Sequence, residues 1–441
     1  HIHLQETLCD DVVAAMLASD VGLWTLDGGR LDIQGTPKFP WGRVNNHPTW
    51  LPGDELRLCP WQRGDYAPNG FPLFTAGAAL PNVELPPGNP PLPTAVLNLT
   101  RDVKISGTAG RRAHIFIHST VPTVHVVKYL EVEYMGPMRL DASGNSMPGV
   151  LGRYGMHSHH SGDNIRGSVF EGIVVKRSGN HGVVTHASHG ARWLGVVTYD
   201  TFNDDFWWDP NHRCLDNLFE ECVAAHVRFE PDFRGYGLTG YALFEGDRNT
   251  LRRCLSVGVL GNGDAAGVTW PERINNAPEG VWGFEDHVVQ NCRRHGIFAW
   301  QNSGTLHLIP TAGKFTAINV GGGGISHGAY LNAYTYKNVE IYNAGEAGLI
   351  SHALPLPAGG GSIVVPRPDG YILAFEDYLI DGAPVGIDIQ RHNLASSEPV
   401  LYKRFTFRNL AGAKVQVNES VQGNFPGNHD FVDCGIAPAD L

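Results

Sequence analysis

A short phrase that recurs from about residue 95 onward limits the folds open to this chain. Three segments each run polar, apolar, polar and then cysteine: DNLFEECVAAHV (216–227), RNTLRRCLSVGV (248–259) and DHVVQNCRRHGI (286–297). Segment 337–349, KNVEIYNAGEAGL, repeats the phrase with Asn343 in the place of the cysteine. Short β-branched strands separated by Asn, Gly and Asp, with no 3.6-residue period, are typical of the coils of a β-solenoid.

The composition agrees with a turn-rich β protein. The chain has 441 residues with 54 glycines and 29 prolines, and charged residues make up only 17%, as expected where many tight turns need Gly, Asn, Asp or Pro. We therefore predict an all-β fold, a right-handed parallel β-helix (a solenoid), over residues 96–441. Residues 1–95 are predicted to form a small N-terminal β cap region over the open edge of the helix, ending in the proline-rich connector PPGNPPLPTA (86–95).

The repeated cysteines are predicted to be structural. Equivalent side chains of successive rungs stack about 4.8 Å apart in a β-helix. Cys222, Cys254 and Cys292 would then form one inward column of small buried thiols, in preference to disulfides, because a buried cysteine behaves as a small hydrophobic residue.

Charge and hydropathy argue against nucleic-acid binding and against a membrane-spanning segment. The chain has 44 Asp and Glu against 33 Lys and Arg, a formal charge of −11, and nucleic-acid binding needs a basic face. No run of 18 apolar residues is present, so we expect no membrane span in this chain. The sequons at Asn98 and Asn418 are compatible with export, and we expect a secreted, extracellular protein.

The segment RYGMHSHHSGD (153–163) is the strongest candidate for chemistry. His157 and His159 are two residues apart, so on a strand both point to the same face. His160 is predicted to point to the other face, as a structural or solvent-facing residue. Asp163 follows at the turn after the strand and is placed to close over the two histidines.

Stacking of rungs supplies partners for this pair from distant sequence. His186 follows about one rung after His159, and Asp209 about one rung after His186, so both are expected beside the pair on one outer face. Imidazoles with carboxylates suit a divalent transition metal such as Zn or Mn better than a pure calcium cage. The identity of the metal among Zn, Mn and Ca stays open. The predicted metal ligands are His157, His159, His186 and Asp163.

Two other histidines and two tryptophans lie near this segment in the sequence. His181 and His189 stand beside glycine turns and are predicted to be surface residues. Trp207 and Trp208, in DDFWWDPN (204–211), are candidates for stacking on a sugar. Adjacent strand residues face opposite ways, so only one of the two tryptophans can line a groove while the other belongs to the core.

Five motifs occur in one order and resemble a known family. They are LDIQGTPKFPW (31–41), LNLTRDVKISGT (97–108), VEYMGP (132–137), GRYGMHSHHSGD (152–163) and VVTHASHG (183–190). The series is similar to the cell-surface hyaluronidases, a family that includes transmembrane protein 2, the hyaluronan-binding cell-migration-inducing protein and, more distantly, fibrocystin. The resemblance covers roughly residues 20–300. It implies a glycine-rich β domain before a right-handed parallel β-helix, and an acidic glycan such as hyaluronan as substrate.

The resemblance also implies site residues, with departures. The family motif Gly-Arg-Tyr-Pro falls on Gly152, Arg153 and Tyr154, and its proline is Gly155 here. Asp204 stands where the family tends to have histidine, and Asp209 where it has an acid. The resemblance favours hydrolysis of the glycan.

Two mechanisms fit the predicted site. A glycoside hydrolase needs an acid and a base or nucleophile, which Asp163 with Asp209 or Asp204 would provide. A lyase would neutralise a uronate with the metal or Arg153, while His159 or Tyr154 removes a proton from carbon.

Two further questions stay open on the sequence alone. Arg153 is equally compatible with a structural bracket that hydrogen-bonds the chain before the strand. Besides a hydrolase and a lyase, the sequence is also compatible with a non-enzymatic β-helix protein that binds or adheres to a glycan without cleaving it. Residues expected to contact substrate are Tyr154, Trp207 and Trp208.

Overall fold

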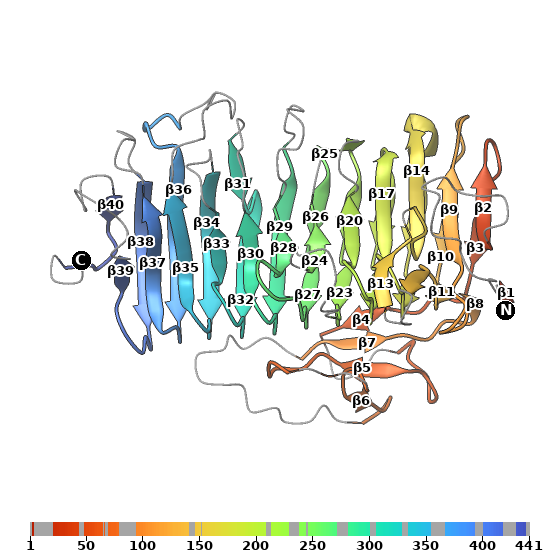
Figure 1. Ribbon diagram of the computed structural model, residues 1–441, viewed down its shortest axis with the longest axis horizontal. Coiled ribbons are helices and arrows are strands. Elements are labelled where there is room, and N and C mark those ends of the chain that lie inside the picture. The colour runs from red at the N-terminus through yellow and green to blue at the C-terminus, as the bar shows by residue number, and fades with distance from the viewer. Residues whose placement is uncertain are drawn as a thin grey trace.

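The computed structural model describes most of the chain. The described residues are 2–3, 21–43, 48–64, 66, 69–78, 94–140, 146–150, 152–208, 213–228, 238–243, 246–270, 281–299, 306–328, 334–353, 367–392, 400–417 and 429–437. They form a long parallel β-helix with its N-terminal end at the right and its C-terminal end at the left of Figure 1. The predicted all-β solenoid is confirmed.

Each full rung contributes three strand segments, which stack into three columns of parallel strands. One column is a sheet of twelve strands: β2 (Gly22–Leu26), β9 (His114–His118), β14 (Met156–Gly162), β17 (Val183–Ser188), β20 (Phe206–Trp208), β24 (Thr239–Ala242), β28 (Ala266–Thr269), β30 (His295–Ala299), β33 (Ile325–His327), β35 (Ala347–Ala353), β37 (Val385–His392) and β39 (Val415–Val417).

The other two columns are separate in the N-terminal rungs and join in the C-terminal ones. The first of them contains β3 (Asp32–Gln34), β10 (Val126–Lys128), β15 (Val169–Glu171), β18 (Arg192–Leu194), β22 (Leu218–Glu220) and β26 (Thr250–Arg252). The second contains β1 (Ile2–His3), β8 (Val103–Ser106), β11 (Leu130–Glu133), β16 (Val174–Lys176), β19 (Val197–Tyr199), β23 (Val223–Ala225) and β27 (Leu255–Val257). The longer strands are β29 (Gly283–Gln290), β32 (Ala312–Ile318), β34 (Tyr334–Tyr342), β36 (Leu373–Asp381) and β38 (Val400–Arg408), with the shorter β31 (His307–Ile309) and β40 (His429–Val432) paired to them.

Single residues in the left-handed conformation turn the chain at two corners of each rung. In one rung these residues are Glu221 and His226, with φ of 54° and 57°, and in the next they are Arg253 and Gly258, with φ of 51° and 68°. We call the two series the first-bend and second-bend ladders. The first-bend ladder is Tyr129, Gly172, Gly195, Glu221, Arg253, Asp286, Gly313, Asn338, Asp377, Arg404 and Asp433, and the second-bend ladder is Tyr134, Arg177, Asp200, His226, Gly258, Asn291, Asn319, Asn343, Gly382 and Asn409.

The core of the coil is a continuous apolar cluster that includes the predicted thiols. All three repeated cysteines are buried and free. Cys222 and Cys254 are level with each other, because the residues that follow them, Val223 and Leu255, are partners in register. The preference for buried thiols over disulfides is confirmed for Cys222, Cys254 and Cys292.

The prediction of a single cysteine column is wrong for Cys292. Gln290 is the register partner of Val257, so Cys292 lies one bend further round the coil than Cys254. The physical reason is that the repeated phrase marks the inward residue after a left-handed bend, and each rung has two bends. Cys254 follows a first bend, whereas Cys292 follows the second bend at Asn291.

The N-terminal region contains the predicted small β structure in a different place. Residues 22–34 already form the first rung, because β2 pairs with β9 and β3 pairs with β10. The separate part is an antiparallel sheet of four strands in the order β4 (Trp41–Gly42), β7 (Val96–Asn98), β5 (Leu56–Leu58) and β6 (Leu73–Phe74). Figure 1 shows this small sheet along the side of the coil, beneath its N-terminal half. It covers the flank of the β-helix instead of its open end.

Apolar packing and polar contacts fasten the small sheet to the flank. Phe71 packs in one buried cluster with residues of β16, β19, β23 and β27, and its backbone N–H donates to the Tyr199 hydroxyl at 2.7 Å. Glu55 forms ion pairs with Lys176 at 2.8 Å and Arg177 at 3.0 Å. These charges are largely buried, so the small sheet and coil form one packed body.

The remaining described elements are short. They are the hairpin of β12 (Met138–Leu140) and β13 (Ser146–Gly149), the pair of β21 (Cys214–Leu215) and β25 (Gly246–Asp247), and one 3-10 turn, η1 (Asp163–Ile165). The described part of the chain holds no helix long and apolar enough to cross a membrane.

Candidate functional site

Three histidines come together on the neighbouring strands β14 and β17. His157 and His159 lie on β14, and His186 on β17 is the register partner of His159. One nitrogen of each ring lies within 4.8 Å of a nitrogen of each other ring. The ring centroids of His157 and His159 are 4.9 Å apart, and those of His159 and His186 are 4.8 Å apart. Stacking of rungs thus places three of the four predicted metal ligands side by side.

These histidines face away from the interior of the coil. Met156, next to His157, belongs to the central apolar core, so the alternation of the strand turns His157 to the outer face. There its register neighbours are Phe116 on β9 and Val184 on β17. His157 is nevertheless only 1% exposed, so its side chain is shielded from solvent by its neighbours.

The prediction that His160 points to the opposite face from His157 and His159 is wrong, whereas the solvent-facing position also predicted for it is confirmed. Its side chain is exposed, and its ring lies 4.4 Å from the rings of both His159 and His186. The reason is a β-bulge after His159, where His160 has φ of 42°, which breaks the alternation of period two. Ala187, the next residue after His186, has φ of 44°, so the bulge repeats in the following rung.

The protonation state of His157 is set by its surroundings. Its Nδ1 donates to the carbonyl oxygen of Gly152 at 3.0 Å, which leaves the lone pair on Nε2. That Nε2 is buried and has no hydrogen-bond partner among the described residues. Burial and then the neighbouring His159 hold the pKa of His157 well below its ordinary value of 6.5. A neutral imidazole with Nδ1–H on a carbonyl and a free Nε2 is the form that binds a metal ion.

The predicted sugar-contacting aromatic residues are buried. Tyr154 is 2% exposed and Trp207 is 6% exposed. One face of Trp207 is covered by His181, which stacks on it at 4.1 Å and 5°, and Tyr154 packs 4.8 Å from His157. Trp208 points inward to the central core, as alternation requires. Tyr154 therefore packs between His157 and Trp207, and none of the three aromatic residues offers much surface to a sugar.

The prediction that His181 is a surface residue is wrong. It is 4% exposed. Its Nδ1 lies 3.4 Å from the Asp204 carboxylate, and its Nε2 lies 3.0 Å from the amide nitrogen of Asn203. Asp204 also accepts hydrogen bonds from the backbone N–H of Thr239 at 2.7 Å. Nothing in the local sequence distinguishes His181 from a histidine in a surface turn. His189, also predicted on the surface, is half-buried.

The predicted carboxylates do not join the three histidines in the described part of the chain. Asp163 begins the turn η1, with a side chain 71% exposed and paired to Arg166 at 2.6 Å. Arg166 also pairs with Asp216 at 3.0 Å. The placement of Asp163 as a metal ligand is therefore corrected, because its arginine partner holds it at the surface. Asp209 lies outside the described residues.

Two further charged residues near the site, Arg153 and Asp205, are buried. Arg153 is 2% exposed, and its carbonyl accepts a hydrogen bond from Asn180 at 3.0 Å, a position that suits the structural bracket. Asp205, next to the predicted Asp204, is fully buried and accepts a hydrogen bond from Thr201. Burial raises the pKa of Asp205 well above its ordinary value. It lies inside the coil and belongs to the fold.

Comparisons with known proteins identify no family for this chain. No family model and no curated protein matches the sequence. Among solved structures, a variant of the catalytic domain of a GH87 alpha-1,3-glucanase in complex with nigerose is similar at a TM-score of 0.46 and 12% identity, over 75% of this chain and 58% of that one. The catalytic unit of a thermostable GH87 alpha-1,3-glucanase from Streptomyces thermodiastaticus has a TM-score of 0.35 and 14% identity, over 76% and 58%. Tailspike protein 3 of bacteriophage CBA120 has a TM-score of 0.26 and 13% identity, over 76% and 57%.

The chain thus spans less than two thirds of the glucanase chains. The resemblance to cell-surface hyaluronidases finds no support in a family model or a curated relative and stays a prediction.

Proposed function

We propose that this protein is an extracellular, metal-dependent enzyme that cleaves an acidic polysaccharide, with hydrolysis as the favoured reaction. The observation that carries the proposal is the convergence of His157, His159 and His186 within ligand distance of one another. The buried Nε2 of His157 adds to it, since a buried polar atom without a partner is costly unless something binds it.

The donor set favours zinc among the metals that the sequence leaves open. Three imidazole nitrogens form a group without a carboxylate among the described residues, and calcium needs six to eight oxygen ligands. Manganese also prefers oxygen, whereas three histidines and one open position are typical of catalytic zinc. When bound there, zinc supplies Lewis acidity and lowers the pKa of a water in the open position.

The residues around the three ligands take supporting roles in this proposal. Gly152 orients His157 through its carbonyl, and Tyr154 packs against the same ring. His160 is the exposed imidazole next to His159 and His186, so it is placed to exchange a proton with solvent during the reaction.

The lyase alternative keeps one observation in its favour. Hydrolysis by two carboxylates needs a pair about 5–9.5 Å apart, and the described residues bring no carboxylate to the three histidines. A lyase needs instead a cation against the uronate and a base such as His159 or His160. The acidic substrate itself follows from the resemblance to hyaluronidases.

Incubation of the protein with hyaluronan and other acidic glycans, with and without a chelator, tests the proposal. Shortening of the chains without unsaturated-uronate absorbance, abolished by the chelator and restored by zinc, is the expected result. Shortening with that absorbance identifies a lyase. Binding without any shortening contradicts the enzyme and leaves the glycan-binding protein.

A further inference from the structure

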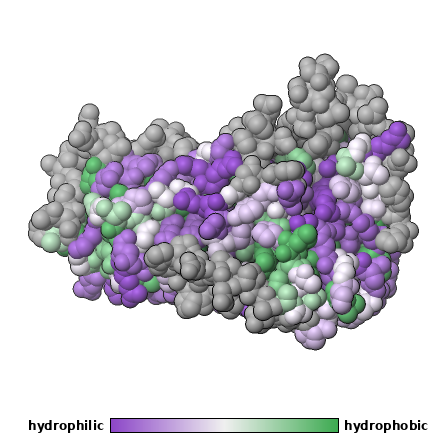
Figure 2. Space-filling view, turned by 90° about the horizontal axis from the view of Figure 1, so that it is seen from below, coloured by the Kyte–Doolittle hydropathy of each residue, from purple (hydrophilic) through white to green (hydrophobic). Residues whose placement is uncertain are grey.

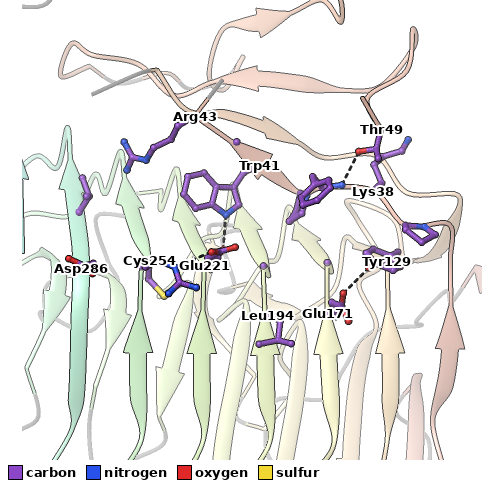
Figure 3. Close-up of a pocket in the computed structure, with 18 residues that line it drawn as sticks. Lys38, Trp41, Arg43, Thr49, Tyr129, Glu171, Leu194, Glu221, Cys254 and Asp286 are labelled. Carbon is purple, nitrogen blue, oxygen red and sulfur yellow. Dashed lines mark hydrogen bonds and ion pairs between the residues drawn. The ribbon is translucent and has the colours of Figure 1, made fainter. Parts of the chain in front are cut away.

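A hollow between the small sheet and the coil lies at a different corner of the molecule from the three histidines. Its volume is about 560 Å³, within the usual range of ligand pockets. One wall is segment 37–43, and the opposite wall is the first-bend ladder from Tyr129 to Asp286. Figure 3 shows Trp41 and Arg43 extending from the small sheet towards the strands of the coil.

Among the described residues, Arg43 is the cation of this hollow that has no carboxylate partner, since Lys38 and Arg253 are both paired. Its Nη1 is buried, with no hydrogen-bond partner among the described residues, and no carboxylate in that part of the chain forms an ion pair with it. Its guanidinium carbon lies 5.7 Å from the centre of the Trp41 ring. Burial lowers the pKa of Arg43, which shows that its charge is held at a cost. A buried charge of this kind is stabilised by an anion that supplies the missing hydrogen bonds.

The other charges that line the hollow already have partners. Lys38 pairs with Asp54 at 2.6 Å, and Arg253 pairs with Glu221 at 3.0 Å. The acids on the coil side limit where an anion fits in the hollow.

Glu171 accepts from Lys128 at 2.8 Å and from the Tyr129 hydroxyl at 2.7 Å. Asp286 accepts a hydrogen bond from the backbone N–H of Lys314 at 3.1 Å. With these acids engaged, the Arg43 end is the place in the hollow where a negative group is favoured.

Trp41 gives the hollow a fixed aromatic wall. Its Nε1 donates to the carbonyl oxygen of Glu221 at 2.6 Å, a bond drawn in Figure 3, so the plane of the ring is set. The ring is half-buried, in contrast to the buried Trp207. A fixed, partly open indole next to a guanidinium is suited to a sugar ring that carries an acidic group.

The hollow continues along the coil. A second, shallower one of about 710 Å³ shares Asp286 with it and extends over the first-bend ladder to Arg404. Its charged residues are paired, for example Lys314 with Glu340 at 2.9 Å. Seen from below, this side of the molecule is largely hydrophilic, with hydrophobic residues gathered over the small sheet (Figure 2). The two adjoining hollows share Asp286 and form one track that follows the first-bend ladder over several rungs.

We propose that this track is a second glycan-binding site, in which Arg43 binds a carboxylate or sulfate group of an acidic polysaccharide and Trp41 stacks on the adjoining sugar. The site is separate from the three histidines and goes beyond the proposed reaction. It would hold a polymer on the enzyme between cleavage events.

Calorimetric titration of the full chain with defined hexasaccharides tests this site. The probes are a hyaluronan hexasaccharide with carboxylates only, a chondroitin sulfate hexasaccharide with both groups, and a neutral cellohexaose, all in the presence of a chelator. We expect the acidic probes to bind more tightly than the neutral one, and Arg43→Gln to weaken them at least tenfold. Preference for the sulfated probe in the wild type, lost in Arg43→Gln, assigns sulfate as the bound group, and equal affinity for the two acidic probes assigns carboxylate.

Matched variants keep the test decisive. Arg30→Gln removes an exposed arginine outside the track, which pairs with Asp32, and should bind like the wild type. Arg43→Lys keeps the charge without the fork and should lie between wild type and Arg43→Gln, which guards against a folding defect in the latter. Equal binding by wild type and Arg43→Gln, or no preference for acidic probes, overturns the proposal. Loss of binding in His157→Ala would place the glycan at the histidines, which overturns the second site and leaves the proposed function standing.

Discussion

The chemistry of the candidate site depends on how single side chains are held. His157 has one nitrogen on the Gly152 carbonyl at 3.0 Å and the other buried without a partner among the described residues. His159 and His186 approach it from the same strand and the next one. This arrangement brings one nitrogen of each of the three rings within 4.8 Å of the others before any ion binds, and the carbonyl that holds His157 is the kind of partner that orients ligands in metal sites.

Removal of one ligand should therefore abolish metal binding. We expect His157→Ala to weaken zinc affinity by at least about 100-fold, because loss of a mere supporting hydrogen bond already costs 10–100-fold. Metal content by mass spectrometry and glycan cleavage should fall together, with the melting temperature little changed. His189→Ala, a half-buried histidine outside the group, is the matched control and should keep its metal. Full metal content in His157→Ala would show that the site is assigned wrongly.

At the level of elements, bends and bulges determine which side chains meet. The bulge that exposes His160 is followed by the same conformation at Ala187 in the next rung, so β14 and β17 distort together and their histidines stay in register. The first-bend and second-bend ladders likewise keep the corners of successive rungs in register. Several of their residues are asparagines, which tolerate the left-handed conformation better than most residues.

Asn291 allows the contribution of a bend to be measured. It has φ of 55° and its side chain donates to the Pro60 carbonyl, which ties the coil to the small-sheet region. Both Asn291→Ala and Asn291→Gly lose this hydrogen bond, but only alanine is strained by the left-handed conformation. We expect Asn291→Ala to be about 1 kcal/mol less stable than Asn291→Gly, as measured by urea unfolding. Equal stability of the two variants would contradict the role of the bend.

At the scale of the whole molecule, the coil buries histidines that must stay neutral. Burial lowers the pKa of His287 and His295 to about 3 and that of His307 to about 4. The unfolded chain takes up protons at these residues near pH 6.5, whereas the folded chain does not. Stability is therefore highest above pH 6.5 and falls as the pH drops from 6.5 towards 4, by up to about 1.4 kcal/mol per pH unit for each residue.

Melting temperatures at pH 7 and pH 5, with a chelator present, test this dependence. The wild type should melt at a clearly lower temperature at pH 5. His287→Gln, compared with its own value at pH 7, should show a smaller difference than the wild type, because one of the buried histidines no longer titrates. A melting temperature that is the same at both values of pH contradicts neutral burial of these histidines.

Much of the architecture was predictable from the sequence, because a β-helix repeats a local pattern. Strand, polar residue and inward residue recur in every rung, so the solenoid and the buried thiols Cys222 and Cys254 follow from the pattern. The position of Cys292 was not predictable in this way, since the two bends of a rung have the same local signature. The position of the small sheet beside the coil was not predictable either, because it depends on long-range contacts such as the ion pair of Glu55 with Lys176.

The candidate site was likewise predictable only where strand alternation and rung length determine it. The pairing of His157 with His159 needs only strand alternation, and the arrival of His186 needs only the length of a rung. The exposed ring of His160 depends on a bulge, and the burial of Tyr154 and His181 depends on packing across rungs. The surface position of Asp163 depends on Arg166, a partner that rung spacing does not reveal.

The most direct test of the central claim is the metal content of the purified wild-type chain after zinc is supplied and the excess is removed. We expect about one zinc ion per chain. Chelation should remove the zinc and abolish glycan cleavage, and resupply of zinc should restore both. A chain that retains no metal, or one that cleaves glycans equally well without it, would contradict the three-histidine metal site.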